Sequence, residues 1–369
     1  MSETRSSAQD KKYLRMACRL ARKAAGRTSP NPQVGAVIVR RGKIIGTGYH
    51  RFAGGDHAEI AALKGAGARA RGATLYITLE PCSHQGRTPP CTRALIRAGI
   101  KEVVCGTKDP NPLVAGRGFR QLRRAGIKVR AGVLKNECRA LIEAFAKYIS
   151  RRVPFVILKL AVTLDGRIAA ASGDARWISG DQSRNTVHRL RNEVDAVIVG
   201  LGTVKADDPL LTCRIPGGRN PWRVVLDSRL SIPLSAKILR LTDPGKTIIA
   251  TGVNAALAKA RAVEALGAQV WRLPLKGGGG HVSWRELLKA LARQGMVSVM
   301  VEGGGATAAS ALKEKVVDKI QFFYAPKILG GDALPMIDRL GLRRVKQAIA
   351  IKNLRANKSG DDLVVTGYL

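Results

Sequence analysis

The stretch PCSHQGRTPPC at residues 81–91, preceded by His57-Ala58-Glu59, decides the fold of the first half of this chain. Its two cysteines, Cys82 and Cys91, and the imidazole of His57 are groups of the kind that bind zinc. A catalytic zinc site uses three such protein ligands and keeps its fourth position open. Glu59 could project beside the metal without binding it, as a proton shuttle requires. The pattern therefore predicts a catalytic zinc centre, with His57, Cys82 and Cys91 as ligands and Glu59 as the catalytic residue.

Two plainer interpretations of these residues stay open. A structural zinc site normally has four protein ligands, and His84 could supply the fourth. Alternatively the two cysteines are small apolar core residues, which is our interpretation of the other four cysteines of the chain. The placement of Glu59 favours the catalytic site over both.

The order H-x-E followed by P-C is typical of zinc-dependent deaminases that act on bases. In such enzymes a carboxylate takes a proton from the attacking water and passes it to the departing amine. Nucleic-acid deaminases usually have two residues between their cysteines, whereas eight separate Cys82 from Cys91. The spacing therefore favours a deaminase of another kind.

Length and composition bound the remaining possibilities. The 369 residues make two domains the expected number. With 45% hydrophobic and 24% charged residues the chain is not a disordered one, and no apolar run reaches the roughly 20 residues of a membrane span. Six cysteines are too few for a disulfide scaffold, and the polar amino terminus does not resemble a secretion signal. We expect a cytoplasmic protein that makes no use of a membrane.

The charge of the chain admits two function classes. Lys and Arg number 63 and Asp and Glu 27, a net charge of +36. Residues 1–150 carry 29 basic and 9 acidic side chains and residues 151–369 carry 34 and 18, so the excess does not lie in a tail. Such a surplus suits a nucleic-acid binder or an enzyme that captures small anions. An aromatic content of 4% argues against base-stacking platforms.

Helical and strand periodicities alternate along the chain and predict an α/β protein. A hairpin follows the first expected helix, and the alternation after it predicts a largely parallel sheet. The polar stretch at residues 150–154, closed by a proline, marks a domain boundary. The expected helices are 11–25, 57–63, 89–98, 118–125 and 136–149, then 183–191, 255–266, 284–293 and 306–312. The expected strands are 34–39, 44–49, 74–79, 102–106 and 128–133, then 155–162, 196–199, 222–226, 247–250, 270–273, 298–302 and 319–324.

Longer blocks follow one another over nearly the whole chain. They include SPNPQVGAVIV (29–39), TLEPC (78–82), DPNPLVAGRG (109–118), LKLAVTLDGRIA (158–169), VGLGTVKADDPLLTCR (199–214) and VEGGG (301–305). Through these blocks the sequence resembles the bifunctional riboflavin-biosynthesis deaminase/reductases (diaminohydroxyphosphoribosylaminopyrimidine deaminase and aminophosphoribosylaminouracil reductase).

The resemblance implies two α/β domains and two reactions. Residues 1–150 would form a cytidine-deaminase-like domain, a zinc-dependent pyrimidine deaminase. Residues 151–369 would form a dihydrofolate-reductase-like domain, an NADPH-dependent reductase. A phosphorylated pyrimidine would lose a ring amine by hydrolysis, and its ribosyl group would then be reduced to a ribityl chain. The implied cofactors are Zn²⁺ and NADPH.

The resemblance also implies roles for single residues. In the deaminase half it adds four substrate-binding positions to the zinc site: Asn31, His50, His84 and Arg87. In the reductase half it implies substrate binding, with the arginines holding phosphate, by Lys159, Arg191, Leu211, Arg214 and Glu302. The implied NADPH positions are Ala161, Trp177, Thr203, Asp207, Ser228, Gly303, Gly304, Gly305, Ala306 and Thr307. Three glycines between a strand and a helix would let the backbone approach a pyrophosphate.

Some features do not follow the resemblance. Ala175 stands where relatives commonly have serine, and His188 and His281 match no motif and are interpreted as surface or packing residues. The net charge motivates an alternative function, a nucleic-acid-directed zinc deaminase whose C-terminal half is a basic binding module. The resemblance favours a small-molecule enzyme without nucleic acid or membrane, and a homo-oligomer, dimeric or larger, assembled through the reductase half.

Overall fold

The structure is a computed structural model that describes residues 7–84, 89–112, 114–277 and 280–369. The chain divides into two compact units, Met1–Arg152 and Val153–Leu369. The expected boundary after residue 150 falls inside the last turn of helix α6 (Glu143–Arg151), just before this division. None of the helices in the described part of the chain combines the length and apolarity that a membrane crossing requires.

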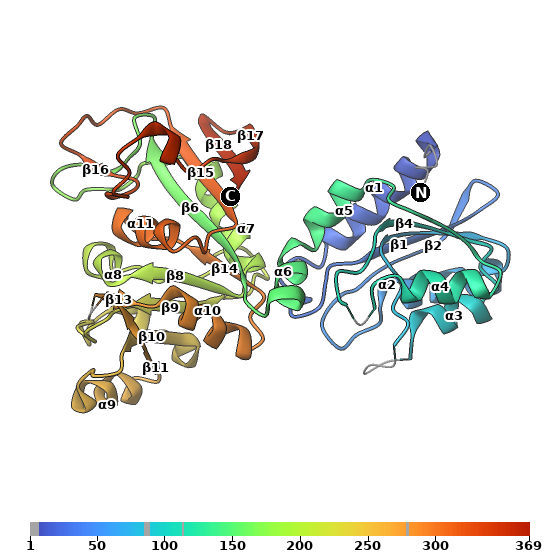
Figure 1. Cartoon of the computed structure of the whole chain (residues 1–369), viewed down its shortest axis with the longest axis horizontal. Coiled ribbons are helices and arrows are strands. Elements are labelled where there is room, and N and C mark those ends of the chain that lie inside the picture. The colour runs from blue at the N-terminus through green and yellow to red at the C-terminus, as the bar shows by residue number, and fades with distance from the viewer. Residues whose placement is uncertain (1–6, 85–88, 113, 278–279) are drawn as a thin grey trace. The chain divides into compact units, whose positions relative to one another are not determined.

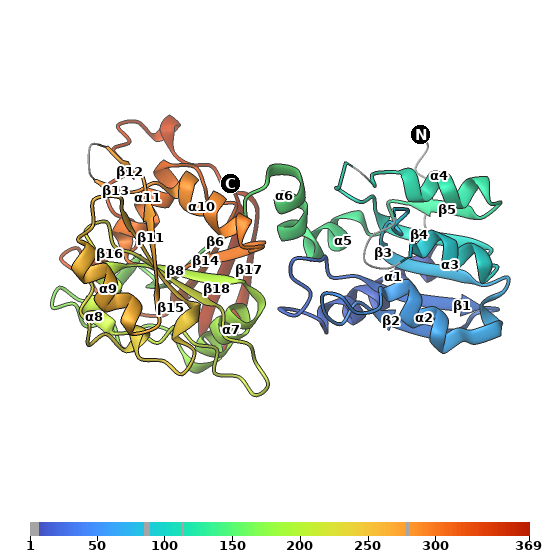
Figure 2. The same cartoon turned by 90° about the horizontal axis from the view of Figure 1, so that it is seen from below.

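The first unit is a five-stranded sheet covered by helices on both faces (Figure 1, Figure 2). The strand order is β2-β1-β3-β4-β5. Helix α1 contacts β1 and β3 and α5 contacts β4, whereas α2 contacts β1 and β2 and α4 contacts β5. The strands are β1 (Gly35–Arg40), β2 (Lys43–Tyr49), β3 (Thr74–Leu79), β4 (Glu102–Thr107) and β5 (Lys128–Ala131). The helices before α6 are α1 (Ala8–Arg22), α2 (Ala58–Ala66), α3 (Cys91–Arg97), α4 (Arg117–Arg124) and α5 (Lys135–Leu141).

The core of this unit has two layers because successive residues of a strand point to opposite faces. In β1, Ala36 and Ile38 pack with residues of α2 and α4, whereas Val37 and Val39 pack with residues of α1. A strand buried on both sides reads as a continuous apolar run, as 36–39 does. Three of the remaining cysteines, Cys18, Cys105 and Cys138, are buried as expected of small core residues, while Cys213 of the second unit is half-buried.

The first sheet is mixed, not largely parallel as the alternation predicted. Strand β1 pairs antiparallel with both β2 and β3, and only β3, β4 and β5 run parallel. The hairpin turn at Arg41 and Gly42, both with positive φ, places β2 at the edge, so β1 lies between two antiparallel partners. The carboxyl ends of β3, β4 and β5 therefore meet at one edge of the sheet, where loops can carry functional side chains.

The second unit is a nine-stranded sheet in the order β11-β10-β9-β8-β14-β6-β15-β18-β17. Neighbours from β11 to β15 are parallel, and β18 and β17 form an antiparallel hairpin at the edge. The strands of the sheet are β6 (Phe155–Thr163), β8 (Ala196–Gly200), β9 (Trp222–Leu226), β10 (Thr247–Gly252), β11 (Gln269–Leu273), β14 (Ser298–Val301), β15 (Lys319–Ala325), β17 (Lys352–Ser359) and β18 (Asp362–Tyr368). Short strands are β7 (Arg167–Ala169), β12 (Leu275–Lys276), β13 (His281–Val282) and β16 (Leu334–Pro335). The helices are α7 (Asp181–Glu193), α8 (Leu201–Asp207), α9 (Leu257–Ala265), α10 (Trp284–Arg293) and α11 (Gly305–Lys313).

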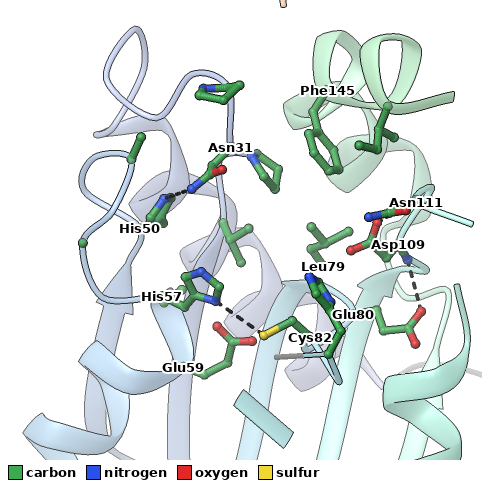
Figure 3. A pocket seen from close by; sticks show the side chains of 18 of the residues that line it. Asn31, His50, His57, Glu59, Leu79, Glu80, Cys82, Asp109, Asn111 and Phe145 are labelled. Carbon is green, nitrogen blue, oxygen red and sulfur yellow. Dashed lines mark hydrogen bonds between the residues drawn. The ribbon is translucent and has the colours of Figure 1, made fainter. Parts of the chain in front are cut away.

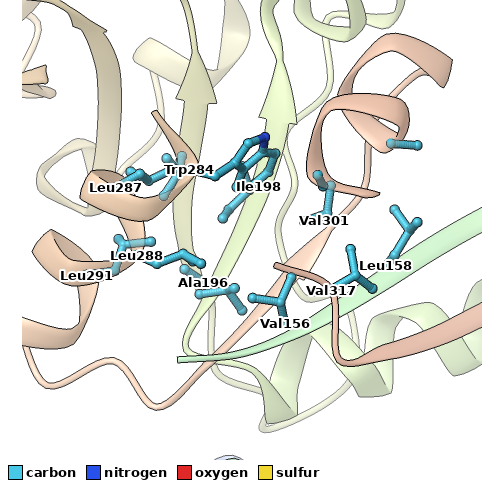
Figure 4. Close-up of a cluster of buried hydrophobic side chains, with 14 of the residues drawn as sticks. Val156, Leu158, Ala196, Ile198, Trp284, Leu287, Leu288, Leu291, Val301 and Val317 are labelled. Carbon is cyan, nitrogen blue, oxygen red and sulfur yellow. The ribbon is translucent and has the colours of Figure 1, made fainter. Parts of the chain in front are cut away.

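The largest hydrophobic cluster of this unit lies between the sheet and helices α10 and α11 (Figure 4). Trp284 is 1% exposed, and its indole Nε1 donates to Ser310 Oγ at 3.0 Å. Ala196 and Ile198 face this cluster, whereas Val197 and Val199, one residue out of phase, pack in a second cluster with α9. Helices therefore cover both faces, as a parallel sheet requires.

Several elements differ from the expectation. Residues 136–149 form two helices, α5 and α6, because the backbone turns at Ile142 (φ −120°). Helix α8 was not predicted, since only its Val204 is buried and the segment has no apolar stripe. The β17–β18 hairpin was also missed, because seven of the eight residues of β17 are exposed and give no alternating pattern.

Candidate active sites

The three predicted zinc ligands lie together in the first unit. His57, Cys82 and Cys91 each offer one ligand atom, and these three atoms all lie within 4.8 Å of one another. His57 Nδ1 is 3.2 Å from Cys91 Sγ and 3.6 Å from Cys82 Sγ. Zinc–ligand bonds of about 2.0 Å to nitrogen and about 2.3 Å to sulfur, at tetrahedral angles, put such atoms roughly 3.5 Å apart. The donor set and its spacing therefore fit zinc.

Close packing of helix on strand places two members of the site. His57 is the N-cap residue of α2, and Glu59 lies in its first turn. Helix α2 rests directly on β2, where Gly48 and Gly46 leave room for its backbone: a Cβ on Gly48 would lie 2.3 Å from the carbonyl oxygen of Ala58. Such a contact needs glycine, so Gly48 fixes where the helix begins.

The two cysteines come from the loop that follows β3 and from the start of α3. Cys91 is the first residue of α3, and its N–H donates to Cys82 Sγ at 3.3 Å. Hydrogen bonding with the Cys91 thiol lowers the pKa of Cys82, and burial opposes this effect. The nearby His57 ring lowers the pKa further, to about 4. A lowered pKa favours the thiolate, the form in which cysteine binds metals.

Glu59 is 4% exposed and lies beside this cluster. Burial, and then the nearby Cys82 thiolate, raise the pKa of Glu59 to about 7. A carboxyl group that exchanges its proton near neutral pH suits transfer in both directions.

A cavity of about 450 Å³ opens above the cluster (Figure 3). His50, 3% exposed, shares a hydrogen bond between Nδ1 and the Asp56 carbonyl at 3.0 Å, which requires the proton on Nδ1. Burial lowers the pKa of His50, so the ring is neutral and its Nε2 accepts from Asn31 Nδ2 at 3.1 Å. The amide of Asn31 is thereby oriented, with Oδ1 left as an acceptor.

The predicted pocket residues Asn31, His50 and His84 all line this cavity, and Arg87 lies outside the described residues. His84 is exposed and is not a member of the metal cluster among the described residues, which disfavours a four-ligand structural site. Sequence reasoning missed Asp109 and Asn111, which also line the cavity. They follow β4 as Cys82 follows β3, and this shared position at the carboxyl edge could have revealed them.

A second cavity, of about 300 Å³, lies in the second unit and is built around Glu302. Arg191 Nε donates to Glu302 Oε1 at 2.8 Å and Arg191 Nη2 to Oε2 at 2.9 Å, and Lys159 Nζ lies 3.5 Å from Oε2. Burial alone would raise the pKa of Glu302, but the charges of Arg191 and Lys159 outweigh it and hold the pKa at about 2. The cavity therefore has a fixed carboxylate flanked by two cations.

The predicted substrate residues of this half, Lys159, Arg191, Leu211, Arg214 and Glu302, all line the cavity. Arg191 also donates from Nη1 to the Thr212 carbonyl at 3.1 Å. Each of its three guanidinium nitrogens therefore already donates a hydrogen bond within the protein. Arg214 is exposed and has no carboxylate within 4.0 Å among the described residues. Of the two arginines, Arg214 is the one available to a phosphate.

The predicted NADPH positions divide into two groups. Ala161, Trp177, Thr203, Asp207, Gly303 and Gly304 line the cavity, whereas Ser228, Gly305, Ala306 and Thr307 are not among the described residues that line it. Gly304 N donates to Thr203 Oγ1 at 3.3 Å, and a Cβ on Gly304 would meet no atom closer than 3.9 Å. A Cβ on Gly305 would instead lie 2.6 Å from the carbonyl oxygen of Pro335, so packing explains that glycine.

Helix α7 carries a residue that sequence reasoning misjudged. His188 lines the cavity and is not a plain surface or packing residue; its Nδ1 is buried without a hydrogen-bond partner in the described structure. Burial, and then the charge of Arg191, lower its pKa. Arg184, His188 and Arg191 follow one another at intervals of four and three, and this helical spacing could have revealed the face.

Matches to two protein families agree with this architecture. The family described as RibD C-terminal domain matches residues 154–365, and the family described as cytidine and deoxycytidylate deaminase zinc-binding region matches residues 7–107. Fold and sites thus define a cytidine-deaminase-like zinc domain followed by a reductase domain.

Full-length relatives make the assignment specific. RibD of Aquifex aeolicus is 47% identical over 357 residues, covering 96% of this chain and 97% of that protein. RibD of Escherichia coli K12 is 39% identical over 368 residues, covering 96% and 98%. The chain belongs to the RibD family of riboflavin biosynthesis proteins.

Solved structures agree with the sequence relatives. RibD of Acinetobacter baumannii superposes with a TM-score of 0.86 at 36% identity, covering 98% of each chain. A Thermotoga maritima protein, described as a diaminohydroxyphosphoribosylaminopyrimidine deaminase/5-amino-6-(5-phosphoribosylamino)uracil reductase, gives 0.84 at 38%, again covering 98% of each chain. The predicted family and bifunctional activity are confirmed: the chain is a deaminase and a reductase that uses zinc and NADPH. Nothing in these comparisons supports a nucleic-acid-directed deaminase.

Proposed function

We propose that the first cavity removes a ring amine from a diaminopyrimidine bearing a phosphoribosylamino group, the substrate named for the Thermotoga relative. The observation that carries the proposal is the trio of zinc-type ligands within 4.8 Å beside a buried carboxyl group, Glu59. Bound zinc supplies the Lewis acidity that lets water attack the ring at neutral pH. Water adds to the carbon that bears the amine, and ammonia leaves. Glu59 accepts the proton of the water and delivers it to the departing amine.

The pocket residues would orient the pyrimidine. Asn31 Oδ1 is free to accept a hydrogen bond from a substrate amino group, because Nδ2 is committed to neutral His50. His84 lines the cavity and, with Arg87, would donate hydrogen bonds to the ribose phosphate. His57, Cys82 and Cys91 would hold the zinc.

The second cavity would reduce the ribosyl carbon to open the sugar into a ribityl chain. The nicotinamide would supply the hydride to the ribosyl carbon, and the ring oxygen released from that carbon would take a proton from solvent. Lys159, Arg191 and Glu302, held together by their ion pairs, would orient the sugar hydroxyls, and Leu211 would pack against the substrate. Arg214 would bind the phosphate, since its guanidinium has no carboxylate partner within 4.0 Å among the residues described. The cofactor would lie along Ala161, Trp177, Thr203, Asp207, Ser228 and the segment Gly303, Gly304, Gly305, Ala306 and Thr307.

On this proposal residues 1–150 are the deaminase domain and residues 151–369 the reductase domain. The protein would act in the cytoplasm on a small molecule and without nucleic acid. A homo-oligomer formed through the reductase half is supported by β17, an edge strand whose exposed residues include Leu354. An unpaired edge of this kind is a template for pairing with another chain. Light scattering of the wild type and of Leu354→Lys tests the oligomer: an unchanged mass would place the interface elsewhere.

One assay series tests the two activities. The pyrimidine nucleotide is added to the zinc-loaded protein, ammonia release is followed, and NADPH oxidation is then followed in the same sample. We expect ammonia first and NADPH oxidation only after it. Ammonia without NADPH oxidation would remove the reductase assignment, and NADPH oxidation of the undeaminated nucleotide would contradict the order of the steps.

A further inference from the structure

A third cavity, of about 880 Å³, lies in the first unit beyond the carboxyl ends of β4 and β5. Gly106 and Thr107 at the end of β4 and Ala131 at the end of β5 form its base, and α4 and α5 supply side chains from the two faces of the sheet. The carboxyl edge of parallel strands is where open α/β sheets bind ligands. The volume is within the range of small-molecule sites.

The cavity is lined by five cations: Lys108, Arg120, Arg123, Lys135 and Arg139. None of the five has a carboxylate within 4.0 Å in the described part of the chain, although ion pairs form elsewhere in this unit, as between Arg130 and Asp10. Two carboxyl groups also line the cavity, those of Asp109 and Glu143. Asp109 is buried, and its Oδ1 accepts from the N–H of Asn111 at 2.8 Å. The lining therefore has an uncompensated positive charge.

Two of the cations converge beside Gly116. The position that a Cβ would occupy there lies 3.4 Å from Lys108 Nζ and 3.5 Å from Arg120 Nη1. The two charged groups are thus no more than about 7 Å apart, a separation at which like charges repel. Gly116 has a φ of +79° and no side chain, so nothing at this position separates the two cations.

Helix α4, which lines the cavity, also has an excess of positively charged residues. Its eight residues, RGFRQLRR, include four arginines, among them Arg120 and Arg124 at positions i and i+4. Like charges at this spacing destabilise a helix. The two oxygens of Glu80 already accept the N–H groups of Gly116 and Phe119 at the start of α4, so the helix end itself is satisfied. The arginines are what remain without an acidic partner.

We propose that this cavity is a second ligand site of the deaminase domain, which binds a small molecule through a phosphate group. Among the described residues its lining shares Asp109 alone with that of the zinc cavity. Lys108 and Arg120 would hold the phosphate, because their charged groups converge on one point and a doubly charged anion would offset their repulsion. Arg123, whose guanidinium carbon lies 5.9 Å from the ring centroid of Phe119, and the cations of α5 would bind further oxygens. A metal ion does not suit a lining of this charge.

The test is calorimetric titration of the full-length, zinc-loaded protein with inorganic pyrophosphate, with NADPH saturating the reductase cavity. The test variant is Lys108→Gln/Arg120→Gln. The control is Arg97→Gln, an exposed arginine of α3 that does not line the cavity. We expect the double variant to lose one pyrophosphate site, or to weaken it about tenfold or more, and the control to match the wild type. Binding of AMP but not of adenosine at the same site would show that the phosphate is the group recognised.

Four results would overturn the proposal. Wild type and double variant could bind pyrophosphate equally, or neither could bind it. A raised KM for deamination in the double variant would assign these cations to the phosphate of the known substrate. An RNA oligonucleotide that binds more tightly than pyrophosphate, and loses that affinity in the double variant, would make the cavity a nucleic-acid surface.

Discussion

Gly48 of β2 lies against the carbonyl oxygen of Ala58, so closely that a Cβ on the glycine would be 2.3 Å from that oxygen. The contact joins the strand to the first turn of α2, whose N-cap is His57 and whose first turn holds Glu59. The close approach at Gly48 therefore helps to position both a zinc ligand and the proton-transferring carboxyl group.

Replacing Gly48 by alanine should move the start of α2 away from the sheet. We expect Gly48→Ala to bind zinc more weakly, to deaminate more slowly and to unfold at lower temperature, with a destabilisation of roughly 1–3 kcal/mol, typical of overpacking. The control is Gly65→Ala on the same helix, where a Cβ would meet no atom closer than 3.7 Å. Gly65→Ala should be neutral or stabilising by up to about 1 kcal/mol. Metal content and thermal unfolding of the two variants decide the matter, and equal zinc content would contradict the expectation.

Glu59→Gln should separate metal binding from proton transfer. The ligands His57, Cys82 and Cys91 are untouched, so we expect full zinc occupancy, while ammonia release should fall by about 10²–10⁴-fold because the amide cannot carry the proton. Cys82→Ala is the matched comparison, since it should lose zinc as well as activity. Metal analysis and an ammonia assay on both variants distinguish the roles. A Glu59→Gln enzyme that turns over like the wild type would remove Glu59 from the mechanism.

The sequence predicted the metal cluster because one histidine, two cysteines and a nearby glutamate are the residue types that form catalytic zinc sites. His57, Cys82 and Cys91 could be named without coordinates, and the structure brings them together. The contact that positions them could not be foreseen, since Gly48 in sequence is a strand glycine like any other. The partners of Arg191 could not be foreseen either: its guanidinium donates hydrogen bonds to Glu302 and to the Thr212 carbonyl.

Strand and helix predictions succeeded where burial imposes a pattern of apolar residues, periodic or continuous. Residues 196–199 are buried on both faces of the sheet and read as a continuous apolar run. Residues 352–358 are exposed throughout, and their place at the edge of the sheet depends on β18 rather than on a pattern of their own. The mixed first sheet was missed for a related reason. The hairpin motif predicts that β1 and β2 are antiparallel, but it does not predict the direction of β3, which pairs with the other edge of β1.

Arg214→Ala should affect the reductase alone. The guanidinium lines the second cavity and has no carboxylate partner within 4.0 Å in the described structure, so its loss removes a phosphate contact without breaking an ion pair. We expect the KM of the reductase for its phosphorylated substrate to rise about tenfold or more, with little change in deamination. Arg285→Ala, an exposed arginine of α10 outside the cavity, is the control. A parallel fall of both activities would mean that the two sites are not independent.

The buried carboxylate of Glu302 should make the reductase unit sensitive to acid. The charges of Arg191 and Lys159, outweighing burial, hold the pKa of Glu302 at about 2, against an ordinary value of 4.5 in the unfolded chain. A group with a lowered folded pKa stabilises the fold fully above its unfolded pKa, and loses that contribution as the pH falls through the folded pKa. The shift corresponds to about 3 kcal/mol, lost progressively below about pH 4.5.

Glu302→Gln should therefore flatten the acid side of the stability profile. At neutral pH the variant leaves the side chains of Lys159 and Arg191, which are only 13% and 12% exposed, without their partner, at a cost of about 3–5 kcal/mol. Between about pH 5 and pH 3, however, its free energy of unfolding should fall less steeply than that of the wild type, because the titrating group is gone. Glu264→Gln, an exposed carboxylate on α9, should keep the wild-type slope. Chemical unfolding across this pH range measures both quantities, and a Glu302→Gln slope equal to that of the wild type would show that other carboxylates govern the acid sensitivity.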